Sequence, residues 1–315
     1  MTTPIRVGVI GVGYLGNIHA KIYSNLPGVE LVGVVDVDRA TVDRVAANYG
    51  CPGYTEPTDL IGKVDAVSIV VPTSLHLETA RPFLEAGVHM LMEKPLAPSY
   101  EESLELVELA EQSNVLFQVG HLERFNGGVV ELAKRVKNPR FMEVTRIGPF
   151  VARATDVDVV TDLMIHDIDI VMSLVGEPIA SIAAAGTPVI TDHIDIANAR
   201  LEFANGVVAN VTASRVSNKQ QRRIRVFEQE HYYGLDYTNQ QITVATTQPP
   251  AEGEEFSSVV SEELKIEPRL PLNHELEVFI DTIRNGGTPL VTGRVALEAV
   301  RVAHIIKEKI SVCQS

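Results

Sequence analysis

The sequence predicts an α/β protein with two domains, an N-terminal doubly wound parallel sheet and a C-terminal α/β domain built on a large, mostly antiparallel open sheet. Short apolar runs alternate with helical patterns through the first 122 residues, an order typical of a parallel sheet covered by helices. Farther on, the strands lengthen and follow one another through tight turns, of which Asn205-Gly206 is the clearest. The length of 315 residues suits two domains of ~100–200 residues each. We therefore expect domains at 1–122 and 123–315.

The first domain is predicted from short apolar runs, each followed by a helical pattern. Strands are expected at 5–10, 30–36, 65–72, 89–95 and 115–121, and helices at about 16–26, 39–47, 74–85 and after Ser99. Ser99 stands three residues before Glu102, the spacing of a capping box at a helix start.

The second domain is predicted from longer strands and four helices. Helices are expected at about 126–136, 158–174, 273–283 and 295–310, and strands at 181–190, 195–203, 207–216, 223–230, 232–238 and 240–246. Residues 246–270 are rich in Pro, Glu and Ser and indicate a long exposed loop.

Composition narrows the function classes. The formal net charge of -14 argues against a nucleic-acid partner, which needs a surplus of Lys and Arg. No apolar run approaches the ~20 residues that span a bilayer, and the N-terminus does not resemble a signal peptide, so we expect no membrane association. Cys51 and Cys313 are too few for a disulfide framework or a CxxC zinc site, which favours a reducing cytoplasm.

A glycine motif follows the first predicted strand. Gly11, Gly13 and Gly16 have GxGxxG spacing, and Asp36 ends the next strand twenty residues after Gly16. In this context the motif predicts a Rossmann dinucleotide site, with the pyrophosphate at a helix N-terminus and the acid on the adenosine ribose. An acid at this point repels a 2′-phosphate and favours NAD over NADP, although Arg39 nearby leaves NADP open. A glycine-rich turn without a ligand is the alternative.

Two clusters carry candidate chemistry. Lys94 ends a buried strand, where a lysine beside a cofactor can act on a substrate hydroxyl; a surface ion pair with Glu93 is the alternative. Asp162, His166 and Asp169 share one face of a predicted helix, and a carboxylate beside an imidazole suits a general base. A helix-surface pair or a buried structural histidine would give the same pattern. A metal site is also conceivable, but no third segment supplies a clear ligand, so we expect no metal.

These motifs together resemble the glucose–fructose oxidoreductase/inositol dehydrogenase/MocA (Gfo/Idh/MocA) family over essentially the whole chain. The resemblance rests on GVGYLG (11–16), VPTSLH (71–76), Glu93-Lys94-Pro95 and Asp162-xxx-His166. It implies a Rossmann domain followed by an α/β domain whose open sheet often serves oligomerisation, so we expect a homodimer or homotetramer. It also implies that Lys94 and His166 flank the reacting carbon and that Asp162 places the substrate. The implied NAD contacts are Gly11, Gly13, Tyr14, Leu15, Gly16, Asp36, Thr73, His76, Glu93 and Lys94.

Within the family, VGHLERFNGGV (119–129), DLMIHDIDIVMSLVG and ASRVSNKQQRRIRVFE are similar to the group of UDP-N-acetylglucosamine 3-dehydrogenases. Candidate substrate contacts are Arg124, Asn126, Arg153, Asp162 and His166. A basic cluster, Arg215, Lys219, Arg222, Arg223 and Arg225, would suit a diphosphate, or it would protect a strand edge from aggregation. Strand alternation puts Arg223 and Arg225 on one face and Arg222 on the other.

The sequence therefore predicts an NAD-dependent oxidoreductase acting on a secondary alcohol of a sugar or nucleotide sugar. The preferred substrate group is the C3 hydroxyl of UDP-N-acetylglucosamine. Alternatives are a dehydrogenase of inositol or a free aldose in the same family, and a non-catalytic NAD(H)-binding regulator.

Overall fold

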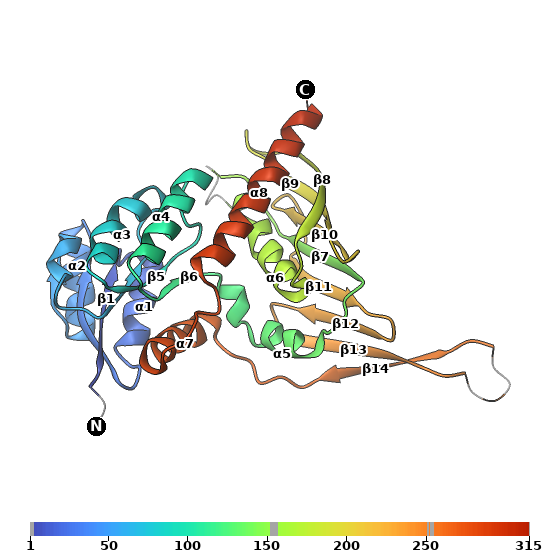
Figure 1. Ribbon diagram of the computed structural model, residues 1–315, viewed down its shortest axis with the longest axis horizontal. Coiled ribbons are helices and arrows are strands. Elements are labelled where there is room, and N and C mark those ends of the chain that lie inside the picture. Colours follow the sequence, from blue (N-terminus) through green and yellow to red (C-terminus); the bar gives the residue numbers. More distant parts are fainter. Residues whose placement is uncertain (1–2, 152–156, 251, 253–254, 315) are drawn as a thin grey trace. The chain divides into compact units, whose positions relative to one another are not determined.

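The computed structural model describes residues 3–151, 157–250, 252 and 255–314 (Figure 1). The chain divides into two compact units. The first contains Met1–Leu122 and Pro271–Val300, and the second contains Glu123–Leu270 and Arg301–Ser315. Residues 271–300, which we had expected in the second domain, thus return to the first unit. Within the described residues, no helix has both the length and the apolar composition needed to cross a membrane.

The first unit is built on a six-stranded, all-parallel sheet in the order β3-β2-β1-β4-β5-β6. Its strands are β1 Ile5–Ile10, β2 Val29–Val35, β3 Gly53–Tyr54, β4 Ala66–Ile69, β5 His89–Met92 and β6 Phe117–Val119. Its helices are α1 Tyr14–Tyr23, α2 Arg39–Tyr49, α3 His76–Glu85, α4 Tyr100–Gln112 and α7 Pro271–Asn285, with short 3-10 turns η1 Pro57–Leu60 and η2 Thr73–Leu75. The doubly wound sheet predicted from sequence is confirmed.

Local sequence signals explain where these helices begin. The Ser99 hydroxyl accepts a hydrogen bond from the Glu102 backbone N–H at 3.1 Å and caps α4, the contact that the capping-box spacing predicts. The apolar face of α7 packs into the same core as α1, where Tyr23, Leu276 and Phe279 are fully buried. That apolar face is the reason why α7 joins the first unit.

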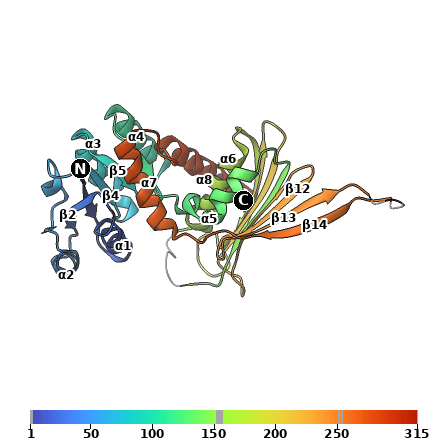
Figure 2. The same cartoon turned by 90° about the horizontal axis from the view of Figure 1, so that it is seen from below.

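The second unit is built on an eight-stranded sheet in the order β14-β13-β12-β11-β7-β10-β9-β8, in which only the β7–β10 pair is parallel. Its strands are β7 Phe141–Ile147, β8 Ile179–Thr187, β9 Ile196–Phe203, β10 Val208–Ser214, β11 Gln221–Phe227, β12 His231–Asp236, β13 Gln241–Gln248 and β14 Ser258–Leu264. Its helices are η3 Leu122–Phe125, α5 Gly127–Arg135, a π-helix turn Val160–Met164 and α6 Ile165–Val175; α8 Gly293–Gln314 begins in the first unit and ends in the second. Helices α5 and α6 lie over one face of the sheet (Figures 1 and 2).

Two elements of this sheet differ from the sequence expectation. The predicted loop 246–270 contains β14, which pairs antiparallel with β13. The strand was missed because it is an edge strand with almost every residue exposed, so no apolar alternation marks it. The central strand β7 was also not predicted, although its residues alternate between buried and partly exposed.

Candidate active site

Two of the three motif glycines are required sterically at the start of α1, and the third borders open space. Gly11 has φ +86°, and a Cβ on it would lie 2.5 Å from the Val70 carbonyl oxygen. A Cβ on Gly16 would lie 1.8 Å from the Gly11 carbonyl oxygen, so only a residue without a side chain allows the helix to approach the strand so closely. A Cβ on Gly13, the N-cap of α1, would meet nothing within 4 Å. The open space beside Gly13 fits the close approach of a dinucleotide pyrophosphate, which the helix N-terminus would favour electrostatically.

Asp36 ties the glycine loop to the end of β2. One carboxylate oxygen accepts from the Val12 N–H at 2.9 Å, and the other accepts from the Asp38 N–H at 3.1 Å. Arg39, which had left NADP open, is paired with Asp43 at 2.9 Å on the exposed side of α2. Tyr14 is 87% exposed at the start of α1, and Leu15 beside it is partly exposed.

The turns after β4 and β5 are joined by His76. Its Nδ1 lies 3.1 Å from the Leu96 carbonyl oxygen and its Nε2 lies 3.0 Å from that of Val71. The ring is buried, and burial lowers its pKa. Through these two carbonyls the ring connects the segments that follow β4 and β5, and its contact with the cofactor stays a prediction. Thr73 opens η2, and the peptide bond between Lys94 and Pro95 is cis.

Glu93 lies directly after the carboxyl end of β5. His19 from α1 is fully buried, and its Nε2 lies 3.3 Å from a Glu93 carboxylate oxygen. On the other side, a Cβ on Gly120 would come within 3.1 Å of the same carboxylate. Glu275 of α7 is also fully buried, and burial together with the charge of Glu93 raises its pKa well above the usual range. The sequence did not suggest His19 or Glu275, since neither belongs to a recognised motif.

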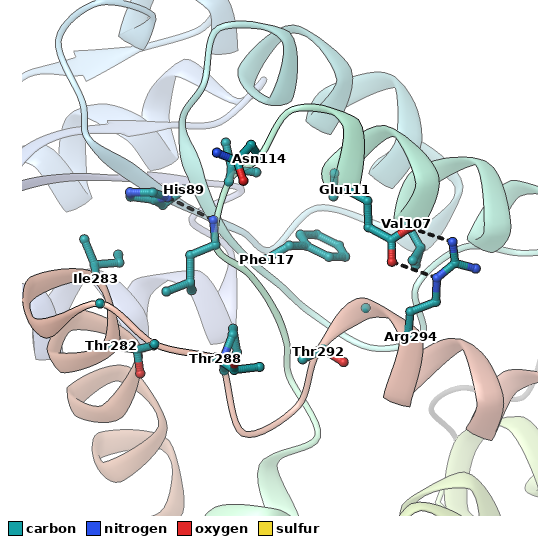
Figure 3. A pocket seen from close by; sticks show the side chains of 17 residues that line it. His89, Val107, Glu111, Asn114, Phe117, Thr282, Ile283, Thr288, Thr292 and Arg294 are labelled. Atoms are coloured by element: carbon teal, nitrogen blue, oxygen red, sulfur yellow. Dashed lines mark hydrogen bonds and ion pairs between the residues drawn. The ribbon is translucent and has the colours of Figure 1, made fainter.

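A cavity of about 500 Å³ in the first unit lies away from these residues, at the amino ends of β5 and β6 (Figure 3). The Leu116 N–H donates to Nδ1 of His89 there at 3.0 Å, and Arg294 pairs with Glu111 at 2.6 Å. Ligands of open α/β sheets bind at the opposite, carboxyl ends of the strands. None of the predicted site residues lines this cavity, and we do not assign it to the reaction.

In the second unit, Asp162 lies in the π-helix turn that leads into α6, and His166 lies in the first turn of α6. Single π-helical turns in longer helices are frequent at functional sites. Asp162 lines a cavity of about 160 Å³, and both side chains are partly exposed. The other polar side chains around this cavity, which we call the Asp162 cavity, are Arg146, Ser214, Arg215, Gln220 and Arg222.

Buried ion pairs hold the helices of this unit to its sheet. Arg146 donates two hydrogen bonds of 2.8 Å to Asp167 and one of 2.9 Å to Glu123. Burial opposes the charge of Arg146, but these two carboxylates raise its pKa. Arg124 donates to Asp169 at 2.8 Å. Sequence analysis missed Arg146 and Asp167, although a charged residue among the inward positions of β7 was a visible signal.

The remaining predicted substrate contacts differ in their burial and in their hydrogen-bond partners. Asn126 is buried; its side chain accepts from the Gly128 N–H, which caps α5, and donates to the Tyr237 carbonyl. Its contact with the substrate stays a prediction. Arg124 is engaged with Asp169 and is 14% exposed. Arg153 lies outside the described residues.

The arginines of the predicted basic cluster lie on opposite faces of the sheet. Arg215 is buried against Asp195 at 2.6 Å. Arg223 donates to the Tyr232 hydroxyl and Arg225 pairs with Glu143, both on the face away from α6. Arg222 alone of the three β11 arginines lines the Asp162 cavity.

Comparison with known proteins adds the relationships of the chain. Residues 5–121 match the oxidoreductase family with an NAD-binding Rossmann fold, and residues 127–231 match the GFO/IDH/MocA C-terminal domain. UDP-N-acetylglucosamine 3-dehydrogenase of Acidithiobacillus ferrooxidans is 37% identical over 89% of this chain and 88% of the relative. The scyllo-inositol 2-dehydrogenase (NAD(+)) of Bacillus subtilis is 29% identical over 93% and 90%.

Solved structures agree with these relationships. UDP-N-acetylglucosamine 3-dehydrogenase GnnA from A. ferrooxidans superposes with a TM-score of 0.91 at 33% identity, covering 99% of both chains. Levoglucosan dehydrogenase in complex with NADH and levoglucosan superposes with a TM-score of 0.86 at 20% identity, covering 98% of both chains, which shows a shared fold.

Proposed function

This chain belongs to the GFO/IDH/MocA oxidoreductase family, and on that premise we propose that it oxidises the C3 hydroxyl of UDP-N-acetylglucosamine to a ketone with NAD. The observation that carries the proposal is the 37% identity with a UDP-N-acetylglucosamine 3-dehydrogenase along 89% of the chain. An inositol dehydrogenase activity is the second candidate, favoured by the 29% identity with scyllo-inositol 2-dehydrogenase.

We assign the chemistry to Lys94, His166 and Asp162. Bound NAD⁺ supplies the hydride acceptor. A ring nitrogen of His166 removes the hydroxyl proton, and Asp162 orients the sugar hydroxyl. The Lys94 ammonium donates a hydrogen bond to the developing alkoxide and stabilises its charge. The reverse assignment, with Lys94 as the base, uses the same residues.

Turnover with a substrate panel tests this function. The purified chain is supplied with NAD⁺ and, in separate reactions, UDP-N-acetylglucosamine, free N-acetylglucosamine, myo-inositol and scyllo-inositol, and NADH is followed by near-UV absorbance. We expect turnover of the nucleotide sugar and a product two hydrogens lighter by mass spectrometry. The 3-deoxy analogue of the nucleotide sugar is the control and should give no NADH.

Faster turnover of an inositol with none of the nucleotide sugar would replace the first candidate by the second. Absence of turnover with every sugar, together with tight NADH binding, would favour the non-catalytic regulator.

We further propose a homodimer or homotetramer in the cytoplasm. The assembly is supported by the sheet face opposite α5 and α6, where the rings of Phe141 and Tyr232 each contact the ring of Phe227. Light scattering of the purified chain tests the assembly, and fractionation of cells tests the location. A monomer at micromolar concentration would contradict the first part.

A further inference from the structure

The Asp162 cavity contains two arginines that face each other across neighbouring strands. The antiparallel register of β7 and β11 puts Arg222 directly opposite Arg146. The next pair on the same face, Val144 and Ile224, is buried beneath the helices, so both arginines point to the covered side of the sheet. Two guanidinium groups so placed repel each other unless anions lie beside them.

Arg146 has such anions within the protein. Asp167 and Glu123 receive three of its five N–H groups, and the guanidinium is 5% exposed. Arg215, the third arginine of the cavity, is likewise bound to Asp195, to the Val157 carbonyl and to the Thr191 hydroxyl. The side chains of Arg146 and Arg215 are therefore hydrogen-bonded mainly within the protein.

Arg222 differs from both. It makes no side-chain hydrogen bond or ion pair with any residue in the described part of the chain. It is partly exposed, and its N–H groups can reach a ligand in the cavity. Burial raises the pKa of Asp167 and Arg146 opposes this, with a smaller contribution from Arg222, so the two arginines share one electrostatic environment.

We propose that Arg222 binds the diphosphate of the nucleotide-sugar substrate and thereby selects nucleotide sugars over free sugars and polyols. The inference rests on the proposed function, since it assigns the charged part of that same substrate. The planar guanidinium fork matches phosphate oxygens in two-point hydrogen bonds. The cavity of about 160 Å³ is smaller than the ~300–1,000 Å³ of pockets that enclose a drug-sized ligand, so it suits one anionic group. Gln220 supplies a neutral donor at the same cavity.

Strand β11 provides charge-matched controls for the test. Arg222→Gln removes the cavity arginine, whereas Arg223→Gln and Arg225→Gln remove the same charge from the opposite face of the same strand. A charge-assisted hydrogen bond contributes about 1.5–3 kcal/mol, so we expect Arg222→Gln to raise the KM for UDP-N-acetylglucosamine by ~10–100-fold. The KM for NAD and kcat should change much less. Arg222→Lys should recover part of the loss, and both controls should match the wild type.

Competitive inhibition identifies the part of the substrate that is recognised. Inhibition by UDP should weaken in Arg222→Gln by the same factor as KM, while inhibition by uridine, which has no phosphate, should stay unchanged. An equal KM increase in all three variants would overturn the inference, as would a fall in kcat with unchanged inhibition by UDP.

The inference and the proposed function can fail separately. If the wild type turns over UDP-N-acetylglucosamine and Arg222→Gln has the same KM, the function stands and the inference is wrong. If the wild type turns over no nucleotide sugar, the proposed function is wrong. Calorimetric titration of the wild type and Arg222→Gln with UDP then tests whether Arg222 binds a diphosphate. UDP binding that Arg222→Gln alone loses would support the diphosphate site, and equal or absent binding would overturn it.

Discussion

The two units differ in the surroundings of their buried carboxyl groups. In the second unit, each buried carboxylate that the structure describes has a cationic partner: Asp158 with Lys307, Asp167 with Arg146, Asp169 with Arg124 and Asp195 with Arg215. In the first unit, Glu275 is fully buried, and neither carboxyl oxygen has a hydrogen-bond partner among the described residues. In the described part of the chain, the one charge that shifts its pKa is that of another carboxylate, Glu93.

The difference shows that burial alone does not fix the charge of an acid. Burial opposes ionisation of Asp195, but the backbone N–H groups of Thr191, Val189 and Ile190 and the Arg215 guanidinium outweigh it and lower its pKa. Glu275 has no such donors, and burial raises its pKa. We therefore expect a protonated Glu275 in the first unit and an ionised Asp195 in the second. The following predictions test this contrast.

The largest effect is expected from Arg146→Met, which leaves the buried Asp167 and the partly buried Glu123 without their cation. Breaking a buried pair on one side costs about 3–5 kcal/mol. For a protein of this size the Tm should fall by about 10 °C, since each kcal/mol corresponds to ~2–4 °C. Thermal unfolding by circular dichroism measures it. Arg200→Met breaks the exposed pair with Glu202 and is the control, with little change expected; an equal loss in both variants would refute the role of burial.

The next effect concerns the proposed catalytic residues, of which Lys94 belongs to one unit and His166 to the other. Lys94→Met in the first and His166→Asn in the second should each lower kcat by at least ~100-fold, the scale of general acid–base catalysis. NAD binding, measured by fluorescence titration of NADH, should persist in both. Lys134→Met and His304→Asn change exposed residues of the same types and are the controls. Wild-type turnover in either test variant would remove that residue from the mechanism.

A smaller and pH-dependent effect is expected from Glu275→Gln. Because the folded pKa lies above the unfolded value, the wild type loses stability as pH rises from the ordinary glutamate pKa towards the folded one. A neutral amide avoids this loss, worth about 1.4 kcal/mol per pKa unit. The Tm difference between variant and wild type should therefore increase from pH 5 to pH 8. Glu277→Gln, exposed on the same helix, should show no such trend; a flat difference for Glu275→Gln would mean that Glu275 is ionised.

The smallest effect is expected from Asp36→Asn at the surface of the first unit. The amide oxygen can still accept from the Val12 N–H, but the charge that repels a 2′-phosphate is gone. The preference for NAD over NADP, measured as the ratio of kcat/KM values, should fall by about tenfold, equivalent to ~1.4 kcal/mol. An unchanged ratio would assign the preference to another residue.

The glycine motif, Asp36 and Ser99 were predictable because these residue types occur at fixed spacings relative to the predicted strands and helices. The alternation of strands and helices likewise revealed the parallel sheet. By contrast, β14 could not be identified from apolar alternation, since an exposed edge strand has none. Arg146 was overlooked because its partners Asp167 and Glu123 come from other elements, and the inward position of an arginine is stable only with them.

The sequence by itself determined the fold class, the dinucleotide loop and the family, because these follow from local spacing and side-chain type. Only the tertiary structure decided which charges are neutralised within the protein. Strand pairing between β7 and β11 separated Arg222 from Arg223 and Arg225, and helix packing brought α7 with Glu275 into the first core. Both results depend on contacts between residues far apart in the chain, and the electrostatic state of a buried group is set by those contacts.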